Sequence, residues 1–158
     1  MSDILARLHT CIEHETRLIE GFIAVLEEEQ GLLEAHGAID ALESVTARKN
    51  GYADQLAAAD TLRGKLLYQA GFTNSDNALQ HAARKHAELA APVEHLLSLA
   101  QRASALNTAN GITISAYLAH NRLALNELQH LVGAGNLYDA QGRSKRGAAS
   151  TLANVRAG

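Results

Sequence analysis

The first 35 residues carry one apolar stripe that constrains what the whole chain can fold into. Its steps alternate strictly between four and three residues, the spacing of side chains on a helix that packs along another helix. The stripe consists of Leu8, Ile12, Glu15, Ile19, Phe22, Leu26, Glu29 and Leu33. Such a helix is roughly 50 Å long, so other helices or a partner must cover its stripe.

The amino-acid composition of the chain favours helices over strands. Among 158 residues there are one Pro, two Phe and no Trp, and the apolar residues are mainly Ala and Leu, which favour helix. Few large aromatic residues allow only narrow seams between helices. The sequence therefore predicts an all-α fold, an elongated antiparallel hairpin or bundle of about four helices. Their expected ranges are 3–35, 40–70, 76–90 and 93–132.

Glycine and proline mark the expected helix ends. Gly37 and Gly71 each follow a helical pattern and are expected as left-handed C-terminal caps, and Pro92 is expected to break or kink the chain. A short connection at Gly37 predicts an antiparallel hairpin in which position i faces about 74 − i. Glu29 would then lie near Lys49, and we predict that these two side chains pair. The alternative is that both side chains extend to water.

Charge divides the chain unevenly. Residues 1–36 hold eight acidic residues and two arginines, whereas residues 136–158 hold four basic residues and one acidic residue. We expect one domain over residues 1–135 and a mobile basic tail over 136–158. An acidic rod is a poor nucleic-acid binder, so no nucleic-acid partner is predicted. Short apolar runs predict no membrane insertion, and the single Cys11 is consistent with a cytoplasmic protein.

Little in the sequence indicates catalysis. No phosphate-binding glycine loop is evident, and Cys11 has no oriented base beside it. Glu127 and His130 match the Glu-x-x-His pattern of di-iron bundles, but no second copy exists. We therefore expect no enzymatic activity, no cofactor and no metal. A metal-binding helical bundle is retained as a remote alternative.

Three asparagines on one apolar stripe are typical of a surface that recognises a partner. The stripe of the fourth predicted helix contains Asn107, Asn110 and Asn121, and buried Asn commonly specifies register or partner. Gly111, inside that helix, would permit close approach of a neighbour. Three features together suggest a protein that binds a partner helix: an uncovered seam, polar residues on that seam and a basic tail.

Several segments together resemble the FlgN-type flagellar export chaperones, over residues from about 5 to 143. The acidic first helix ends in the leucine pair Leu32-Leu33, as in that family. Further similar segments are Asp40-Ala41-Leu42-Glu43, Thr46-Ala47-Arg48-Lys49, Arg63, Leu106-Asn107-Thr108-Ala109-Asn110-Gly111 and Leu137-Tyr138-Asp139-Ala140-Gln141-Gly142-Arg143. The FliT-like and FliS-like flagellar chaperones work in a similar way. The Asn-Gly stretch at Asn110-Gly111 favours the FlgN type.

This resemblance implies a cytoplasmic chaperone that binds the C-terminal amphipathic helices of hook-associated (hook–filament junction) proteins. It would prevent their premature self-association and deliver them to the flagellar export gate, as a monomer or weak dimer. Tyr138 is expected to contact the gate. The residues expected to bind partners are Leu106, Asn107, Asn110, Gly111, Ile114, Tyr117, Asn121, Leu137, Tyr138, Gly142 and Arg143. A structural coiled-coil adaptor without a chaperone role is the alternative.

Overall fold

The computed structural model describes residues 1–73 and 76–136, and within these residues every regular element is a helix. The all-α prediction is therefore confirmed. The helices are α1 (Ser2–Glu34), α2 (Ile39–Gln69), α3 (Ala78–Lys85) and α4 (Ala87–Asn136). The chain forms two units, residues 1–112 and residues 113–158. The predicted basic tail from residue 137 onward lies outside the described residues, and the division at residue 135 stays a prediction.

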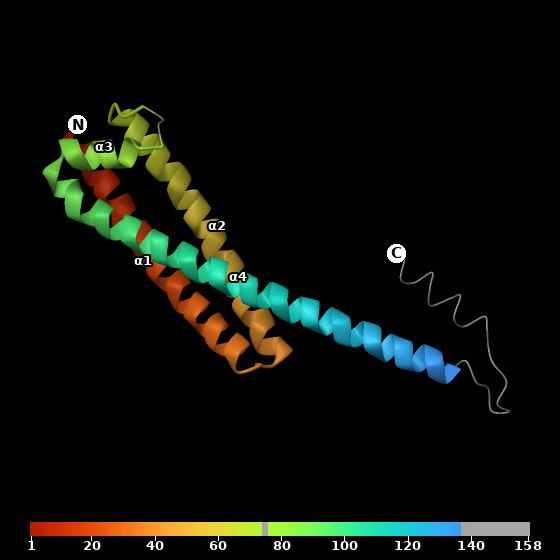
Figure 1. Ribbon diagram of the computed structural model, residues 1–158. Helices are drawn as coiled ribbons and strands as arrows, with labels where there is room; N and C mark the ends of the chain where they lie inside the picture. Colours follow the sequence, from red (N-terminus) through yellow and green to blue (C-terminus); the bar gives the residue numbers. More distant parts are fainter. Residues whose placement is uncertain (74–75, 137–158) are drawn as a thin grey trace. The chain divides into compact units, whose positions relative to one another are not determined.

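In the first unit, α1 and α2 form the predicted antiparallel hairpin and lie side by side in Figure 1. Every residue of the α1 stripe is buried or half-buried. Leu8, Ile12 and Leu26 are its fully buried members. The heptad spacing thus identified the face of α1 that the other helices cover.

Two buried ion pairs fix the register of this hairpin. Lys49 Nζ donates to the Glu29 carboxylate at 3.0 Å and 3.1 Å, as predicted, and Arg63 pairs with Glu15. Glu15 and Glu29 are two heptads apart, and so are Lys49 and Arg63. A slide of one heptad would break both pairs and leave two buried carboxylates without a cation, which is costly. The pairs therefore specify a single alignment.

The connection from α1 to α2 differs in one detail from the prediction. The left-handed residue is His36, with φ 51°, and the expectation that Gly37 would take this conformation is wrong. The N–H groups of His36 and Gly37 donate to the carbonyls of Leu33 and Leu32, a Schellman ending. A Cβ added at Gly37 would lie 3.0 Å from the Leu32 side chain and 3.1 Å from the Leu32 carbonyl oxygen, so a larger residue there would require a small shift of its neighbours.

At the end of α2 the prediction for Gly71 is confirmed. Gly71 has φ 87°, and the N–H groups of Gly71 and Phe72 donate to the carbonyls of Tyr68 and Leu67. Phe72 packs against the hydrophobic core that includes Leu67. This apolar contact accompanies the Schellman ending and turns the chain toward α3.

The break between the third and fourth helices comes at His86, and not at Pro92. His86 is extended, and its ring packs edge-on against Phe72 with 6.0 Å between ring centroids. Pro92 instead lies inside α4, near its beginning. The predicted end of the third helix at residue 90 and start of the fourth at 93 are therefore wrong. A contact with Phe72, distant in sequence, sets the corner.

The first part of α4 covers the hairpin. Leu89, Val93, Leu96 and Ala103 join the core with residues of α1, α2 and α3. Along α1, the contacts of Glu20 with His95 and of Glu27 with Arg102 advance in the same direction on both helices. This segment of α4 therefore runs parallel to α1 and completes the first unit.

Gly21, inside α1, has a specific packing reason. A Cβ added there would lie 2.5 Å from the hydroxyl of Tyr52, whose ring also packs against Phe22 at 6.4 Å between centroids. The expectation that position i faces about 74 − i places Phe22 opposite Tyr52, and this contact confirms it. Gly31 is different, because an added Cβ there would meet open space.

Candidate partner-binding site

Asn110 is the most completely bonded of the residues predicted to bind a partner. Its side-chain amide donates to the Leu26 carbonyl and to Glu29 Oε1, both at 2.9 Å, and the residue is 2% exposed. Glu29 also accepts from Lys49, so one carboxylate joins α1, α2 and α4. Because its amide donors are used inside the first unit, Asn110 holds α4 in register on α1.

The neighbouring predicted residues have mixed surroundings. Leu106 packs partly against the core, whereas Asn107 and Gly111 are exposed. A Cβ added at Gly111 would meet nothing within 4 Å, so the structure shows no close approach at this glycine. Within the first unit, Asn107 and Gly111 are the predicted residues that remain accessible to a partner.

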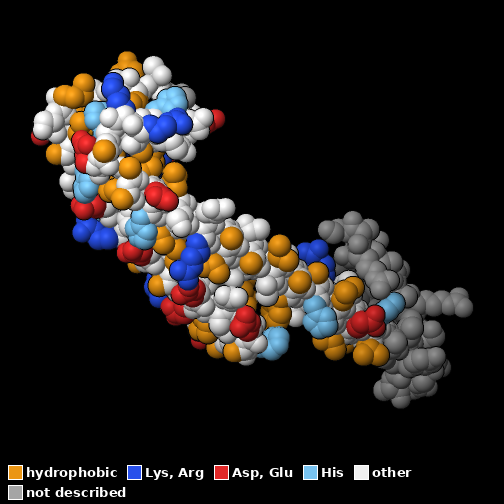
Figure 2. Space-filling view, turned by 60° about the vertical axis from the view of Figure 1, so that its left-hand side comes forward, with side chains coloured by type: hydrophobic (Ala, Val, Ile, Leu, Met, Phe, Trp, Pro, Cys, Tyr) orange, Lys and Arg blue, Asp and Glu red, His pale blue; other side chains and the backbone are white. Residues whose placement is uncertain are grey.

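The second unit exposes an apolar helical surface. Ile114 and Asn121 are half-buried, and Tyr117 is exposed. Large apolar side chains surround them, and Figure 2 shows hydrophobic side chains at the surface of this part of α4. The exposed ones are Tyr117, Leu118, Leu123, Leu125, Leu128, Leu131 and Val132. Exposed apolar surface of this extent is typical of interaction sites.

The residues predicted from the sequence lie on one seam of this segment, and the exposed residues of an adjacent seam were not predicted. Ile114, Tyr117 and Asn121 were predicted, but Leu118 and Leu125 are more exposed than any of these three. A second strict series of four- and three-residue steps was the signal that could have found them. That series is Ile114, Leu118, Asn121, Leu125, Leu128 and Val132. We name the face made by both series the 114–132 stripe.

The remaining predicted site residues, Leu137, Tyr138, Gly142 and Arg143, lie outside the described residues. Nothing in the geometry bears on their expected roles.

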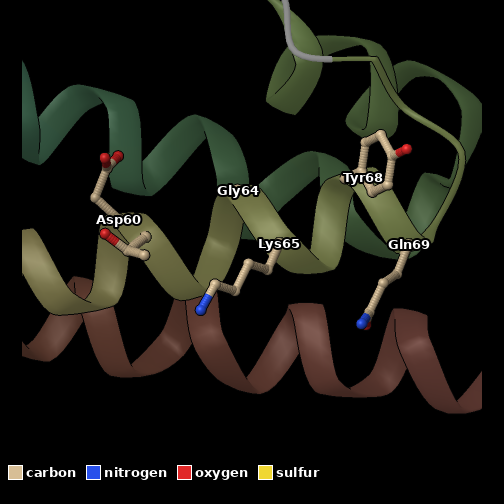
Figure 3. Close-up of a pocket in the computed structure, with 6 residues that line it drawn as sticks. Asp60, Gly64, Lys65, Tyr68 and Gln69 are labelled. Carbon is tan, nitrogen blue, oxygen red and sulfur yellow. The ribbon is translucent and has the colours of Figure 1, made fainter.

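A surface hollow on α2 has little capacity to hold a ligand. Its lining comes from α2 alone, over residues 60–69. Figure 3 shows Asp60 and Tyr68 extending to one side of the helix and Lys65 and Gln69 to the other. Because these polar groups diverge, they do not form the convergent set that small-molecule recognition needs.

In the parts of the chain that the structure describes, we identify neither a metal-binding site nor a reactive thiol. Within residues 1–73 and 76–136, no three His, Cys, Asp or Glu side chains gather to hold a metal ion. Cys11 is buried, and this burial raises the pKa of its thiol, with the carboxylate of Glu15 adding to the effect. A protonated, buried thiol is a weak nucleophile.

Comparison with known protein families agrees with this arrangement. The sequence matches the family model described as FlgN protein over residues 1–146, which include every described residue. The chain belongs to the FlgN family. Comparison with curated proteins and with solved structures gives no match.

Membership of the FlgN family makes this chain one of the flagellar export chaperones, as the resemblance in its segments predicted. Among the described residues, no helix is long and apolar enough to span a lipid bilayer. The FlgN match includes both the hairpin with its buried ion pairs and the 114–132 stripe. A chaperone of this family needs a surface for another protein, and the exposed stripe is the strongest candidate for it.

Proposed function

We propose that this chain binds the C-terminal amphipathic helices of hook-associated proteins in the cytoplasm and delivers them to the flagellar export gate. The observation that supports this proposal is the exposed apolar face of α4 between Ile114 and Val132. A partner helix with its own apolar face would bury these side chains, in the manner of helix-in-groove recognition.

The length and spacing of the stripe suit this role. Its residues recur at heptad-like steps over 19 positions, which correspond to roughly 28 Å of helix. A partner helix of five or so turns would match it. While bound, such a helix could not associate with its own kind through the same face, which is how a chaperone prevents premature assembly.

The residues beyond the stripe enter the proposal through the family resemblance. Leu137, Gly142 and Arg143 would help to clamp the bound helix, and Tyr138 would contact the export gate. Asn107 and Gly111, in the first unit, would also contact the partner, as the resemblance implies. The complex would contain one chaperone, or a weak dimer of it, for each cargo segment.

Calorimetry with the C-terminal segments of the hook-associated proteins tests the proposal. Leu118→Glu and Leu125→Glu place charges on the stripe and are expected to weaken binding by at least about thirtyfold, the effect of losing an interface hot spot. Leu123→Glu is the matched control, since Leu123 is also exposed but lies about 140° around the helix from Leu118. This control is expected to bind almost as well as the unaltered chain.

Two outcomes would contradict the proposal. Equal loss in all three variants would mean that the stripe does not carry the contact. No complex between the unaltered chain and any hook-associated segment would favour a structural coiled-coil adaptor. The role of the tail is tested separately by Tyr138→Ala, which is expected to keep cargo binding and to lose the interaction with the export gate.

A further inference from the structure

The polar residue in the middle of the 114–132 stripe has a counterpart in the first unit. Asn110, Ile114 and Tyr117 are followed eleven residues later by Asn121, Leu125 and Leu128. Eleven residues are close to three turns of helix, so each triplet presents an asparagine and two apolar side chains on one face. The pattern Asn-x-x-x-apolar-x-x-apolar therefore occurs twice in α4.

The first copy of this pattern shows what its asparagine recognises. Asn110 donates one hydrogen bond to the backbone carbonyl of Leu26 and one to the carboxylate of Glu29, each at 2.9 Å. These acceptors stand three residues apart on the facing helix. The Asn110 amide thus recognises a backbone carbonyl, which every residue of a helix has, and a carboxylate three positions later.

The second copy offers the same donors without an acceptor. Asn121 is half-buried on the stripe, and its side chain makes no hydrogen bond to any residue in the described ranges. Covering it with a purely apolar helix would leave at least one N–H of the amide without a side-chain acceptor, which is unfavourable. A partner that fits here must therefore supply acceptors.

The charge beside Asn121 fits a carboxylate. In the first unit the Glu29 carboxylate has Lys49 Nζ at 3.0 Å as its cation. Over residues 113–136 the single Lys or Arg is Arg122, next to Asn121, and it is exposed. An acidic side chain of a docked helix would have both an amide donor and a guanidinium within reach.

We propose that Asn121 selects amphipathic cargo helices that present Asp or Glu to its amide, three positions after the residue whose backbone carbonyl accepts its second hydrogen bond, and that Arg122 balances that charge. The occupant of the stripe is thus an amphipathic helix with the local form of the α1 segment from Leu26 to Glu29. This inference rests on the proposed function, because it assumes that the stripe binds cargo. It adds the chemical feature by which one helix is preferred and its register is set.

A double-mutant cycle tests the inference. The chain is measured as the full-length protein, unaltered or with Asn121→Ala, against hook-associated C-terminal segments in which each acidic residue of the stated pattern is changed in turn to its amide. Asn121→Ala is expected to weaken binding about ten- to thirtyfold, as expected for loss of a hydrogen bond to a charged group. One amide substitution in the cargo should do the same, and the two changes together should cost little more than either.

Asn126→Ala is the matched control, because Asn126 is exposed on α4 and lies about 140° around the helix from Asn121. It is expected to leave affinity unchanged. Helical content and the melting temperature should be the same for both variants, so that a change in affinity is not a change in folding. Arg122→Ala should weaken binding of the acidic segment and have no effect on its amide variant.

The failures are distinguishable. If the unaltered chain binds cargo and Asn121→Ala behaves like Asn126→Ala, or if no cargo carboxylate couples to Asn121, this inference is overturned and the proposed function stands. If sedimentation shows that a second copy of the chain covers the stripe in place of cargo, the inference is also overturned. Absence of any cargo complex with the unaltered chain would overturn both.

Discussion

Residues 87–112 and residues 113–132 belong to one helix, and their apolar side chains have opposite surroundings. In the first segment Leu89 and Leu96 are buried in a core shared with three other helices. In the second, Leu125 is 58% and Leu131 is 67% exposed. Both segments have the same periodic stripe. A stripe therefore shows that a helix needs a partner, and does not show whether the partner belongs to the same chain.

The asparagines sharpen this comparison. Both side-chain N–H groups of Asn110 donate to acceptors on α1, which ends five residues after Glu29. The side chain of Asn121 has no acceptor among the described residues. A buried and satisfied asparagine fixes the register of an existing interface. The proposal above assigns to the half-buried Asn121 the same role in an interface with a bound cargo helix.

The largest effect on stability is expected where the stripe is covered. Leu96→Ala removes a buried side chain and should lower the free energy of unfolding by about 2–5 kcal/mol. Leu125→Ala, the same change on the exposed segment, should alter it by less than about 0.5 kcal/mol. Chemical denaturation followed by circular dichroism measures both. Similar losses in the two variants would remove the distinction between the segments.

The buried polar centre provides the next comparison. Lys49→Ala leaves the Glu29 carboxylate buried with only the Asn110 amide, and should cost about 3 kcal/mol because a buried charge loses its partner. Arg48→Ala removes the cation of the exposed Glu28 pair on the adjacent position and should hardly change stability. If both variants unfold at the same denaturant concentration, the buried pair does not stabilise the hairpin.

The two glycines of α1 are expected to respond with opposite signs. Gly21→Ala places a methyl group 2.5 Å from the Tyr52 hydroxyl and should destabilise the bundle by about 1–3 kcal/mol. Gly31→Ala meets open space inside an exposed helical turn and should stabilise it by up to about 1 kcal/mol. Thermal melts of the two variants give the sign directly. Stabilisation by Gly21→Ala would mean that the Tyr52 ring moves aside at no cost.

The smallest effect concerns the thiol of Cys11. Because burial raises the pKa of this thiol, the native protein should react with an aromatic disulfide reagent more slowly than the protein unfolded in urea. Destabilisation of the covered region by Leu96→Ala should accelerate the native reaction, whereas Leu125→Ala should not. Equal rates in native and unfolded protein would show that the thiol is accessible in the bundle.

Much of the first unit was predictable because its determinants are local or periodic. Helical geometry predicts the α1 stripe with its alternating four- and three-residue steps. Closure of the hairpin then places the polar positions Glu29 and Lys49 on the seam between α1 and α2. The Glu15–Arg63 pair could have been found by the same reasoning, since it repeats Glu29–Lys49 two heptads away. The FlgN segments were likewise readable from residue order.

Other features depended on contacts between distant residues. The sequence located a break near Pro92, but the ring of Phe72 against His86 set it six residues earlier, and proline was accommodated near the start of α4. Three asparagines looked equivalent on one stripe. Only packing on α1 made Asn110 a structural residue and left Asn107 exposed.

By itself, then, the sequence determined the all-α class, the antiparallel hairpin and its register, because side-chain periodicity and buried charges act through spacing along the chain. The tertiary structure decided which part of the α4 stripe is covered. That outcome depends on where α1 ends and on the acceptors that Leu26 and Glu29 offer to Asn110. These are properties of packed surfaces, and residue spacing in a single helix does not contain them.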